Sequence, residues 1–161
     1  MSMRRLGLDH IDLYYLDTGA FTYTPFGETI ETLAGMKTDG LIRHIGLSNV
    51  TADQLRTAMD ITDIAAVAVR YNVAVRLGAA VREVAEATGI VFSPWHPPTI
   101  PGGPEGEPFH AVIDPIAVKH NAAPQQVALV WQLHRTVTAL PIPGTTTSNT
   151  STRTSPPRTS A

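Results

Sequence analysis

The chain has 161 residues, enough for one ordinary domain with a single core, and 43% of them are hydrophobic. A net charge of −2 and the lack of any block of lysine or arginine argue against a nucleic-acid or membrane-surface partner. With no cysteine, no apolar run of membrane-spanning length and no signal-peptide pattern, the sequence predicts a soluble cytoplasmic protein without disulfides or thiolate metal sites.

Strand-like and helix-like segments alternate from the start of the chain. The first strand, His10–Leu16, is rich in aromatic and β-preferring residues. A helix is expected next, with Thr24 as its capping residue, Pro25 at its first position and Gly40 as its end. Leu41–Leu47 then reads as the second strand.

The same alternation continues through the middle of the chain. Thr51 and Gln54 form a capping box that opens a helix. Ile64–Tyr71 is the third predicted strand. A further helix is ended by a glycine, and the fourth strand, Gly89–Pro94, begins there.

The last third of the chain is richer in proline and glycine. Pro97–Pro108 is predicted to be a long loop, and Ile113–His120 a short helix. Pro124 opens another helix, and Val137–Ile142 is the fifth predicted strand. The inner face of that last helix is predicted to consist of Val127, Val130, Trp131 and His134.

This order of elements implies right-handed βαβ units and a parallel sheet covered by helices. A closed (β/α)8 barrel needs about 250 residues. Five strands are too few to close one, so the pattern alone predicts a small open α/β sheet.

Five motifs add a resemblance. "RRLGLDHIDLYYLD", "GLIRHIGLSNV", "GIVFSPWHPP", "KHNAAPQQVALVWQLHR" and "LPIPGTTT" follow one another as in the second half of an aldo-keto reductase, a (β/α)8 barrel that reduces aldehydes and ketones with NADPH. The resemblance runs from Arg4 to Thr147 and makes the five strands barrel strands four to eight. It therefore implies a partial (β/α)8 barrel over residues 1–147, with about five parallel strands and covering helices, that lacks the N-terminal strands of the family.

Active-site residues of such barrels lie at the C-terminal ends of the strands. The residues that directly follow the predicted strands are expected to share that rim: Asp17, Ser48, Asn49, Tyr71, Asn72, Trp95, Gly144 and Thr145. The resemblance implies that Ser48 and Asn49 bind the nicotinamide carboxamide of NADPH and that Trp95 stacks on the nicotinamide ring. It also implies a loop around the pyrophosphate, formed by Pro143, Gly144, Thr145 and Thr146. Without the resemblance, the same residues read as a capped loop, a core or rim aromatic residue and a turn.

Three departures from the family count against activity. Asp17, the candidate catalytic residue, occupies the position of the family's His, and an ionised carboxylate would repel a developing alkoxide. Ala68 stands where the family has a Gln that holds the carboxamide. The catalytic Asp, Tyr and Lys belong to barrel strands one to three; the lysines of this chain, Lys37 and Lys119, both fall on predicted helices.

Residues 148–161 form a Ser/Thr/Pro-rich tail that is predicted to be disordered. In the family a helix that contacts adenosine follows the phosphate loop. A shifted reading frame from Asn149 onward can give an amphipathic Leu/Ala-rich segment of that kind, so a frameshift is one interpretation of the tail. A natural polar tail is the other.

Three functional hypotheses follow from these observations. The chain is a truncated and inactive remnant of an NADPH-dependent reductase of small carbonyl compounds, the C-terminal half of a split reductase, or a non-catalytic interaction module. The second and third require a partner chain, which in a split enzyme supplies the missing barrel strands. An open parallel sheet edge favours such association.

Overall fold

The computed structural model describes residues 5–19 and 24–144. Its centre is a parallel sheet in the order β1-β2-β3-β4. The strands are β1 (Ile11–Asp17), β2 (Ile42–Ser48), β3 (Ile64–Arg70) and β4 (Val91–Trp95). The helices are α2 (Phe26–Thr38), α3 (Ala52–Ile61), α4 (Ala79–Thr88), α5 (Gly103–Lys119) and α6 (Pro124–Leu133).

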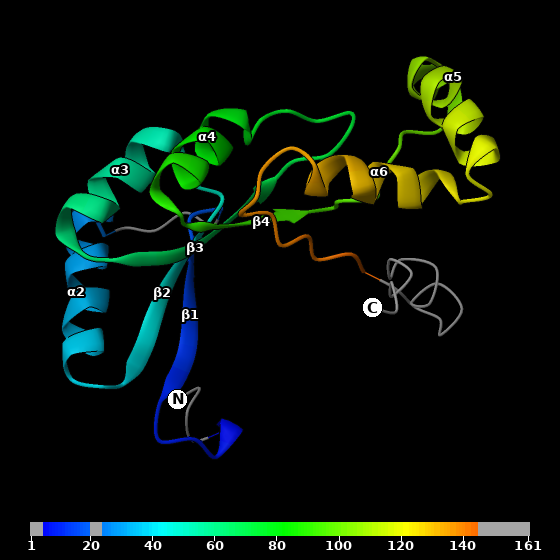
Figure 1. The fold of residues 1–161 in the computed structure, drawn as a ribbon. Helices are drawn as coiled ribbons and strands as arrows, with labels where there is room; N and C mark the ends of the chain where they lie inside the picture. Colours follow the sequence, from blue (N-terminus) through cyan, green and yellow to red (C-terminus); the bar gives the residue numbers. More distant parts are fainter. Residues whose placement is uncertain (1–4, 20–23, 145–161) are drawn as a thin grey trace.

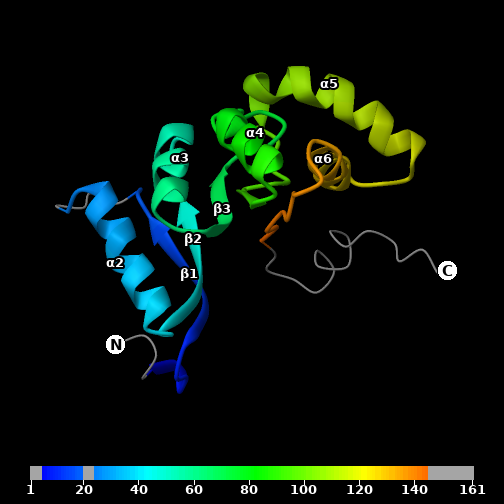
Figure 2. The same ribbon diagram turned by 60° about the vertical axis from the view of Figure 1, so that its left-hand side comes forward.

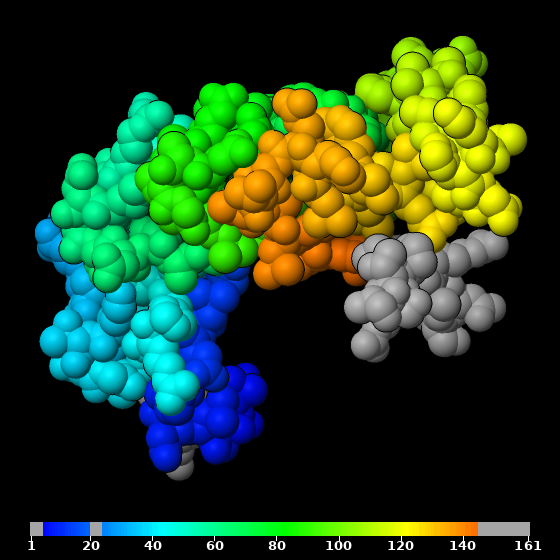
Figure 3. Space-filling model, in the orientation of Figure 1, coloured from blue at the N-terminus to red at the C-terminus, as the bar shows by residue number. Residues whose placement is uncertain are grey.

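Helices α2, α3 and α4 connect successive strands and cover one face of the sheet (Figure 1 and Figure 2). The opposite face is open, and the space-filling view shows a hollow between the blue N-terminal residues and the orange segment before residue 144 (Figure 3). The predicted parallel α/β sheet is therefore confirmed, with four strands.

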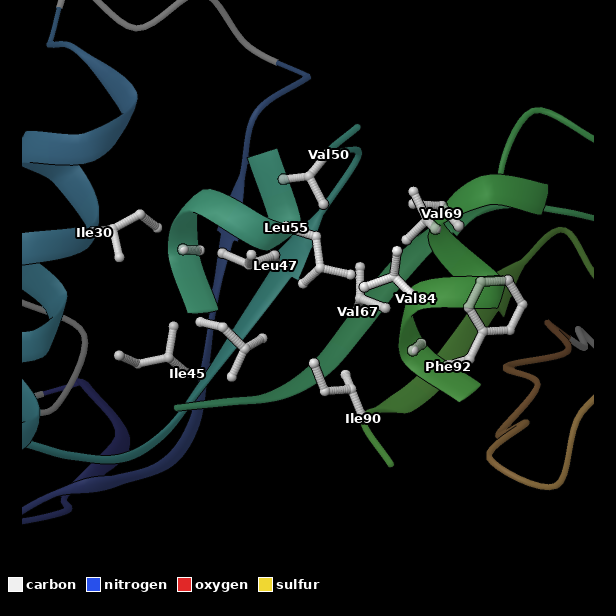
Figure 4. Close-up of a cluster of buried hydrophobic side chains, with 14 of the residues drawn as sticks. Ile30, Ile45, Leu47, Val50, Leu55, Val67, Val69, Val84, Ile90 and Phe92 are labelled. Carbon is white, nitrogen blue, oxygen red and sulfur yellow. The ribbon is translucent and has the colours of Figure 1, made fainter. Parts of the chain in front are cut away.

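The core lies between the sheet and its helices. Side chains of a strand alternate between its two faces, and the helix-facing set is large and apolar. This set comprises Ile45, Leu47, Val67, Val69 and Phe92, all of them buried. Leu55 of α3, which is fully buried, lies beside Leu47 and Val67 in Figure 4 and ties the helix layer to β2 and β3.

Two local signals are confirmed and one is shifted. Thr51 accepts from the backbone N–H of Gln54 (3.2 Å), and the side chain of Gln54 accepts from the N–H of Thr51 (2.9 Å), which is the predicted capping box of α3. Gly89 ends α4 with a φ of 73°, a left-handed conformation that glycine adopts without strain. At α2, however, the N-cap is Pro25 and not Thr24.

The predicted fifth strand, Val137–Ile142, is formed only in part. One isolated parallel bridge joins Ala139 to Phe92, and the N–H of Leu140 donates to the carbonyl of Phe92 (2.8 Å). Pro141 and Pro94 have no N–H to donate, so the ladder cannot extend regularly along this pair. The segment nevertheless lies along β4, as the fifth strand should.

The predicted loop Pro97–Pro108 is wrong over its second half, because α5 begins at Gly103. Proline fits the first turn of a helix, where its missing N–H has no partner to lose, and Pro104 lies there. Pro108 and Pro115 lie further inside the helix. The later part of α5 confirms the helix expected over Ile113–His120.

The predicted inner face of α6 is wrong in part, because Val130 and His134 are exposed whereas Val127 and Trp131 are partly buried. Ala128, Leu129 and Gln132 are the buried residues of this helix, while Val130 is half exposed. The orientation of α6 depends on its packing partners, and Gln132 donates through Nε2 to the backbone carbonyl of Tyr71. Trp131 packs against the edge of the main core.

Candidate functional site

An open pocket of about 270 Å³ lies on the uncovered face of the sheet, at the C-terminal ends of the strands. Its lining consists of Tyr15, Asp17, Ser48, Ala68, Ser93 and Ile142. Four of these form one row across the sheet, because Asp17 pairs with Ser48, Ser48 with Ala68, and Ala68 with Ser93 in the strand register. The parallel topology thus collects one short side chain from each strand at the same level.

The pocket exists because the residues in the middle of this row have small side chains. Ser48, Ala68 and Ser93 leave space above the sheet, whereas Tyr15 and Ile142 form its sides. The hydroxyl of Ser93 donates to the carbonyl of Leu140 (3.1 Å), which holds the segment with Ile142 beside β4.

The ring of Tyr15 lies directly over Gly46, its register partner on β2. A Cβ atom added to Gly46 would lie 2.6 Å from Cε1 of Tyr15, far inside van der Waals contact. Any larger residue at this position would force the ring to move, so the close approach of the ring favours glycine. The contact sets where the phenol forms the side of the pocket.

Three of the predicted site residues are joined by hydrogen bonds at the rim. Nδ2 of Asn49 donates to Oδ1 of Asp17 (2.9 Å), and Nε1 of Trp95 donates to Oδ1 of Asn49 (3.2 Å). Oδ1 of Asp17 also accepts from the N–H of Gly19 (2.8 Å). The ends of β1, β2 and β4 are thereby connected through one amide side chain.

The backbone of Asn49 is held as firmly as its side chain. Its φ is 60°, in the left-handed region that asparagine tolerates better than most residues. Its N–H donates to the carbonyl of Ala68 (2.9 Å), and its own carbonyl accepts from the hydroxyl of Thr18 (2.8 Å).

The surroundings of the pocket shift the pKa values of its two ionisable groups, Asp17 and Tyr15, in opposite directions. The N–H of Gly19, and after it the side chain of Asn49, lower the pKa of the Asp17 carboxyl below its usual value of 3.8. Asp17 is therefore an anion and a hydrogen-bond acceptor at neutral pH. Burial raises the pKa of the Tyr15 phenol above its usual value of 10.0, so that group stays neutral.

The other predicted residues lie in different places. Ser48 lines the pocket, and Trp95 stands at the rim with the guanidinium of Arg70 at 5.8 Å from its ring centre. Pro143 and Gly144 directly follow Ile142, whose N–H lies 3.4 Å from the carbonyl of Pro94. Thr145, Thr146 and the predicted tail, residues 148–161, lie outside the described residues.

Tyr71 and Asn72 do not belong to the rim, contrary to the expectation. The Tyr71 ring is buried, stacked on Trp131 and edge-on to Phe92. Asn72 is fully buried and donates through Nδ2 to the carbonyl of His96 (3.0 Å). Asn72 thereby joins the loops after β3 and β4, and neither residue lines the pocket.

Sequence reasoning missed Tyr15 and Ser93 as lining residues. Each lies two positions before a residue that was recognised, Asp17 or Trp95, and residues two apart on a strand share a face. That spacing is the signal that could have identified them. The two lysines lie elsewhere: Lys37 binds Asp63 on the helix layer (3.3 Å), and Lys119 is exposed in the last turn of α5.

Residues 5–19 and 24–144 contain neither a membrane-spanning helix nor a cluster of metal ligands. No helix in these ranges is both long enough and apolar enough to cross a membrane. In the same ranges, no three His, Asp or Glu side chains come together as metal ligands would.

Comparison with known proteins identifies relatives of the chain. The model of the aldo/keto reductase family matches residues 1–99. An uncharacterised oxidoreductase of Schizosaccharomyces pombe is 37% identical over 145 residues, covering 90% of this chain and 46% of the relative. Pyridoxine 4-dehydrogenase of Escherichia coli is 35% identical over 150 residues, covering 89% and 51% respectively.

Solved structures agree with this assignment. A thermostable aldo-keto reductase in complex with the inhibitor epalrestat superposes with a TM-score of 0.83 at 25% identity, over 95% of this chain and 56% of that chain. An aldo/keto reductase of Klebsiella pneumoniae in complex with NADP and acetate gives a TM-score of 0.77 at 21% identity, over 95% and 55%, and supports the fold alone. The chain spans about half the length of the relatives it matches. It has the architecture of a partial (β/α)8 barrel, and it belongs to the aldo/keto reductase family.

Proposed function

We propose that the pocket is the nicotinamide side of an NADPH site, and that the chain is one part of a carbonyl-reducing barrel. The observation that carries this proposal is the row of Asp17, Ser48, Ala68 and Ser93 at the strand ends, with Asn49 and Trp95 joined beside it. Ser48 and Asn49 offer the donors and acceptors that the nicotinamide carboxamide needs, and the indole of Trp95 offers a flat apolar surface for the nicotinamide ring. The match to the aldo/keto reductase family supports the choice of cofactor.

The pocket lining supplies binding groups but no suitable proton donor. NADPH would provide a hydride, and the carbonyl oxygen would then need a proton. Asp17 is ionised, because its pKa is lowered, and Tyr15 has a raised pKa and no lysine beside it. We therefore infer that the lining residues do not reduce carbonyl compounds by themselves, and that a proton donor must come from outside the pocket lining.

The open face of the sheet is a surface that further barrel strands could cover, as the split-enzyme and interaction hypotheses require. Within the described residues, β1 pairs only with β2, so its outer edge has unpaired backbone groups. Leu13 and Tyr15 are 40% and 38% exposed, and Leu140 and Ile142 are 59% and 52% exposed. These apolar side chains lie where the remaining strands of a barrel would cover them.

Binding of NADPH by the isolated chain should be weak, because Ala68 offers no donor at the centre of the row. The test is titration with NADPH while Trp fluorescence is recorded. We expect no quenching at micromolar NADPH for the unaltered chain and measurable quenching for Ala68→Gln. The matched control is Ala87→Gln, the same change at an exposed position on α4. If neither the unaltered chain nor Ala68→Gln binds even millimolar NADPH, the proposed cofactor site is wrong.

Complementation separates the three hypotheses. The chain is co-expressed with the N-terminal three strand–helix units of the Escherichia coli relative, and oxidation of NADPH by an aldehyde is followed. A stable complex with turnover supports the split enzyme. A stable complex without turnover supports the interaction module, and no complex supports the remnant.

A further inference from the structure

The side-chain amide of Asn49 is engaged at both ends by groups from different strands. Its nitrogen donates to Asp17 at the end of β1, at 2.9 Å, and its oxygen accepts from the indole N–H of Trp95 at the end of β4, at 3.2 Å. Asp17 is anchored in turn by the N–H of Gly19 at 2.8 Å. These contacts connect residues that lie 32 and 46 positions apart in the sequence.

We propose that Asp17 is a positioning residue, whose carboxylate fixes the orientation of the Asn49 amide and, through it, the indole of Trp95. The proposal rests on the proposed function, in which Asn49 and Trp95 face the cofactor. It gives the residue at the family's His position a role that requires no proton transfer.

The chemistry of the two partners allows only one orientation of the amide. A carboxylate can only accept hydrogen bonds, and an indole N–H can only donate. If the amide of Asn49 were turned by 180°, its oxygen would face the Asp17 carboxylate and its N–H₂ would face the indole N–H. Both hydrogen bonds would be replaced by repulsive contacts, so Asp17 and Trp95 together favour the observed orientation over the flipped one.

The fixed amide still has capacity for a ligand. An asparagine amide has two N–H donors and two acceptor lone pairs, and one of each is used here. One donor and one lone pair remain, and a carboxamide needs one of each. A hydrogen bond to an ionised partner is stronger than one between neutral groups, so Asp17 holds the amide better than a neutral residue would.

Nuclear magnetic resonance of the full chain without cofactor tests the positioning directly. The indole N–H of Trp95 and the side-chain N–H₂ of Asn49 are observed in a ¹⁵N correlation spectrum and assigned with Trp95→Phe and Asn49→Ser. We expect Asp17→Ala to move both sets of signals toward the values of exposed side chains. Asp17→Asn should largely preserve them, because its amide oxygen can still accept from Asn49 and Gly19.

The control is Asp12→Ala, which removes another exposed carboxylate of β1, one that binds Arg43 at 2.8 Å and not Asn49. Because Asp17 is itself exposed, its replacement should not unfold the chain. Trp95→Phe provides a second measurement: the Asn49 signals should remain those of a held amide, since Asp17 is still present. Unchanged Trp95 and Asn49 signals in Asp17→Ala would overturn the proposal.

A second arm distinguishes this failure from that of the proposed function. In the Ala68→Gln background, Asp17→Ala should weaken NADPH binding roughly tenfold, and Asp17→Asn should restore most of it. If the spectra change as expected but NADPH affinity does not, Asp17 positions the amide and the cofactor assignment fails. If affinity falls while the spectra do not change, the positioning role is refuted and the cofactor site stands.

Discussion

Substitution of Gly46 by alanine tests the packing that shapes the pocket. The added Cβ would lie 2.6, 2.7 and 2.9 Å from three ring atoms of Tyr15, so the ring must move or the strands must separate. Overpacking of this kind costs about 1–3 kcal/mol of unfolding free energy. We expect Gly46→Ala to destabilise the chain by that amount.

The effect of Gly46→Ala on the unfolding free energy should reverse its sign when the Tyr15 ring is removed. Gly46 does not have a positive φ, so alanine fits its backbone, and replacing glycine then stabilises a protein by about 0.4–1 kcal/mol through the unfolded state. In a Tyr15→Ala background, Gly46→Ala should therefore be neutral or stabilising. The assay is urea unfolding of all four members of the double-mutant cycle.

Gly35→Ala serves as the control, since nothing lies within 4 Å of an added Cβ at that position in α2. It should stabilise the chain by about 1 kcal/mol, because alanine has the higher helix propensity. An equal cost of Gly46→Ala with and without the Tyr15 ring would refute the reasoning, since the strain would then not arise from the ring.

Three further predictions concern pH, association and the core. The pKa of Asp17 is lower in the folded chain than its usual value of 3.8, so the ionised carboxylate stabilises the fold fully above pH 3.8. This stabilisation is lost as the pH falls through the lower, folded pKa. Urea unfolding should therefore show that the difference in stability between the unaltered chain and Asp17→Asn shrinks in acid only. Leu13→Lys places a charge at an exposed apolar position on the edge strand β1. If the chain associates through this edge, the substitution should reduce the mass measured by light scattering. An unchanged mass would argue against such association. Leu55→Ala removes a fully buried side chain and should cost about 2–5 kcal/mol by urea unfolding, whereas a cost below about 1 kcal/mol would show that α3 packs loosely.

The parts of the fold with strong local signals could be predicted from the sequence. The first four strands follow from short β-preferring runs, and the start of α3 and the end of α4 follow from Thr51 and Gly89. These features depend on residues within one or two turns of one another. The resemblance then placed Ser48, Asn49 and Trp95 near one rim. In the structure, Ser48 lines the pocket and Asn49 is hydrogen-bonded to Trp95.

Features that depend on distant partners could not be predicted. Pro108 reads as a helix breaker, yet α5 continues through it. The face that α6 buries depends on the carbonyl of Tyr71 that Gln132 contacts, 61 residues away in the sequence. The bond between Asp17 and Asn49 likewise exists only once β1 and β2 are paired in register.

In β2, β3 and β4, one face carries large apolar side chains and the pocket face carries small ones, and this division has a consequence for protein engineering. Ser48, Ala68 and Ser93 line the pocket, while the residues beside them, such as Leu47, Val67 and Phe92, build the core on the other side of the sheet. A combinatorial library at the three small positions can therefore change the size and polarity of the pocket without touching the helix layer. Because neighbouring residues of a strand point to opposite faces, substitutions can reshape the site while the side chains that hold the sheet and its helices together stay the same.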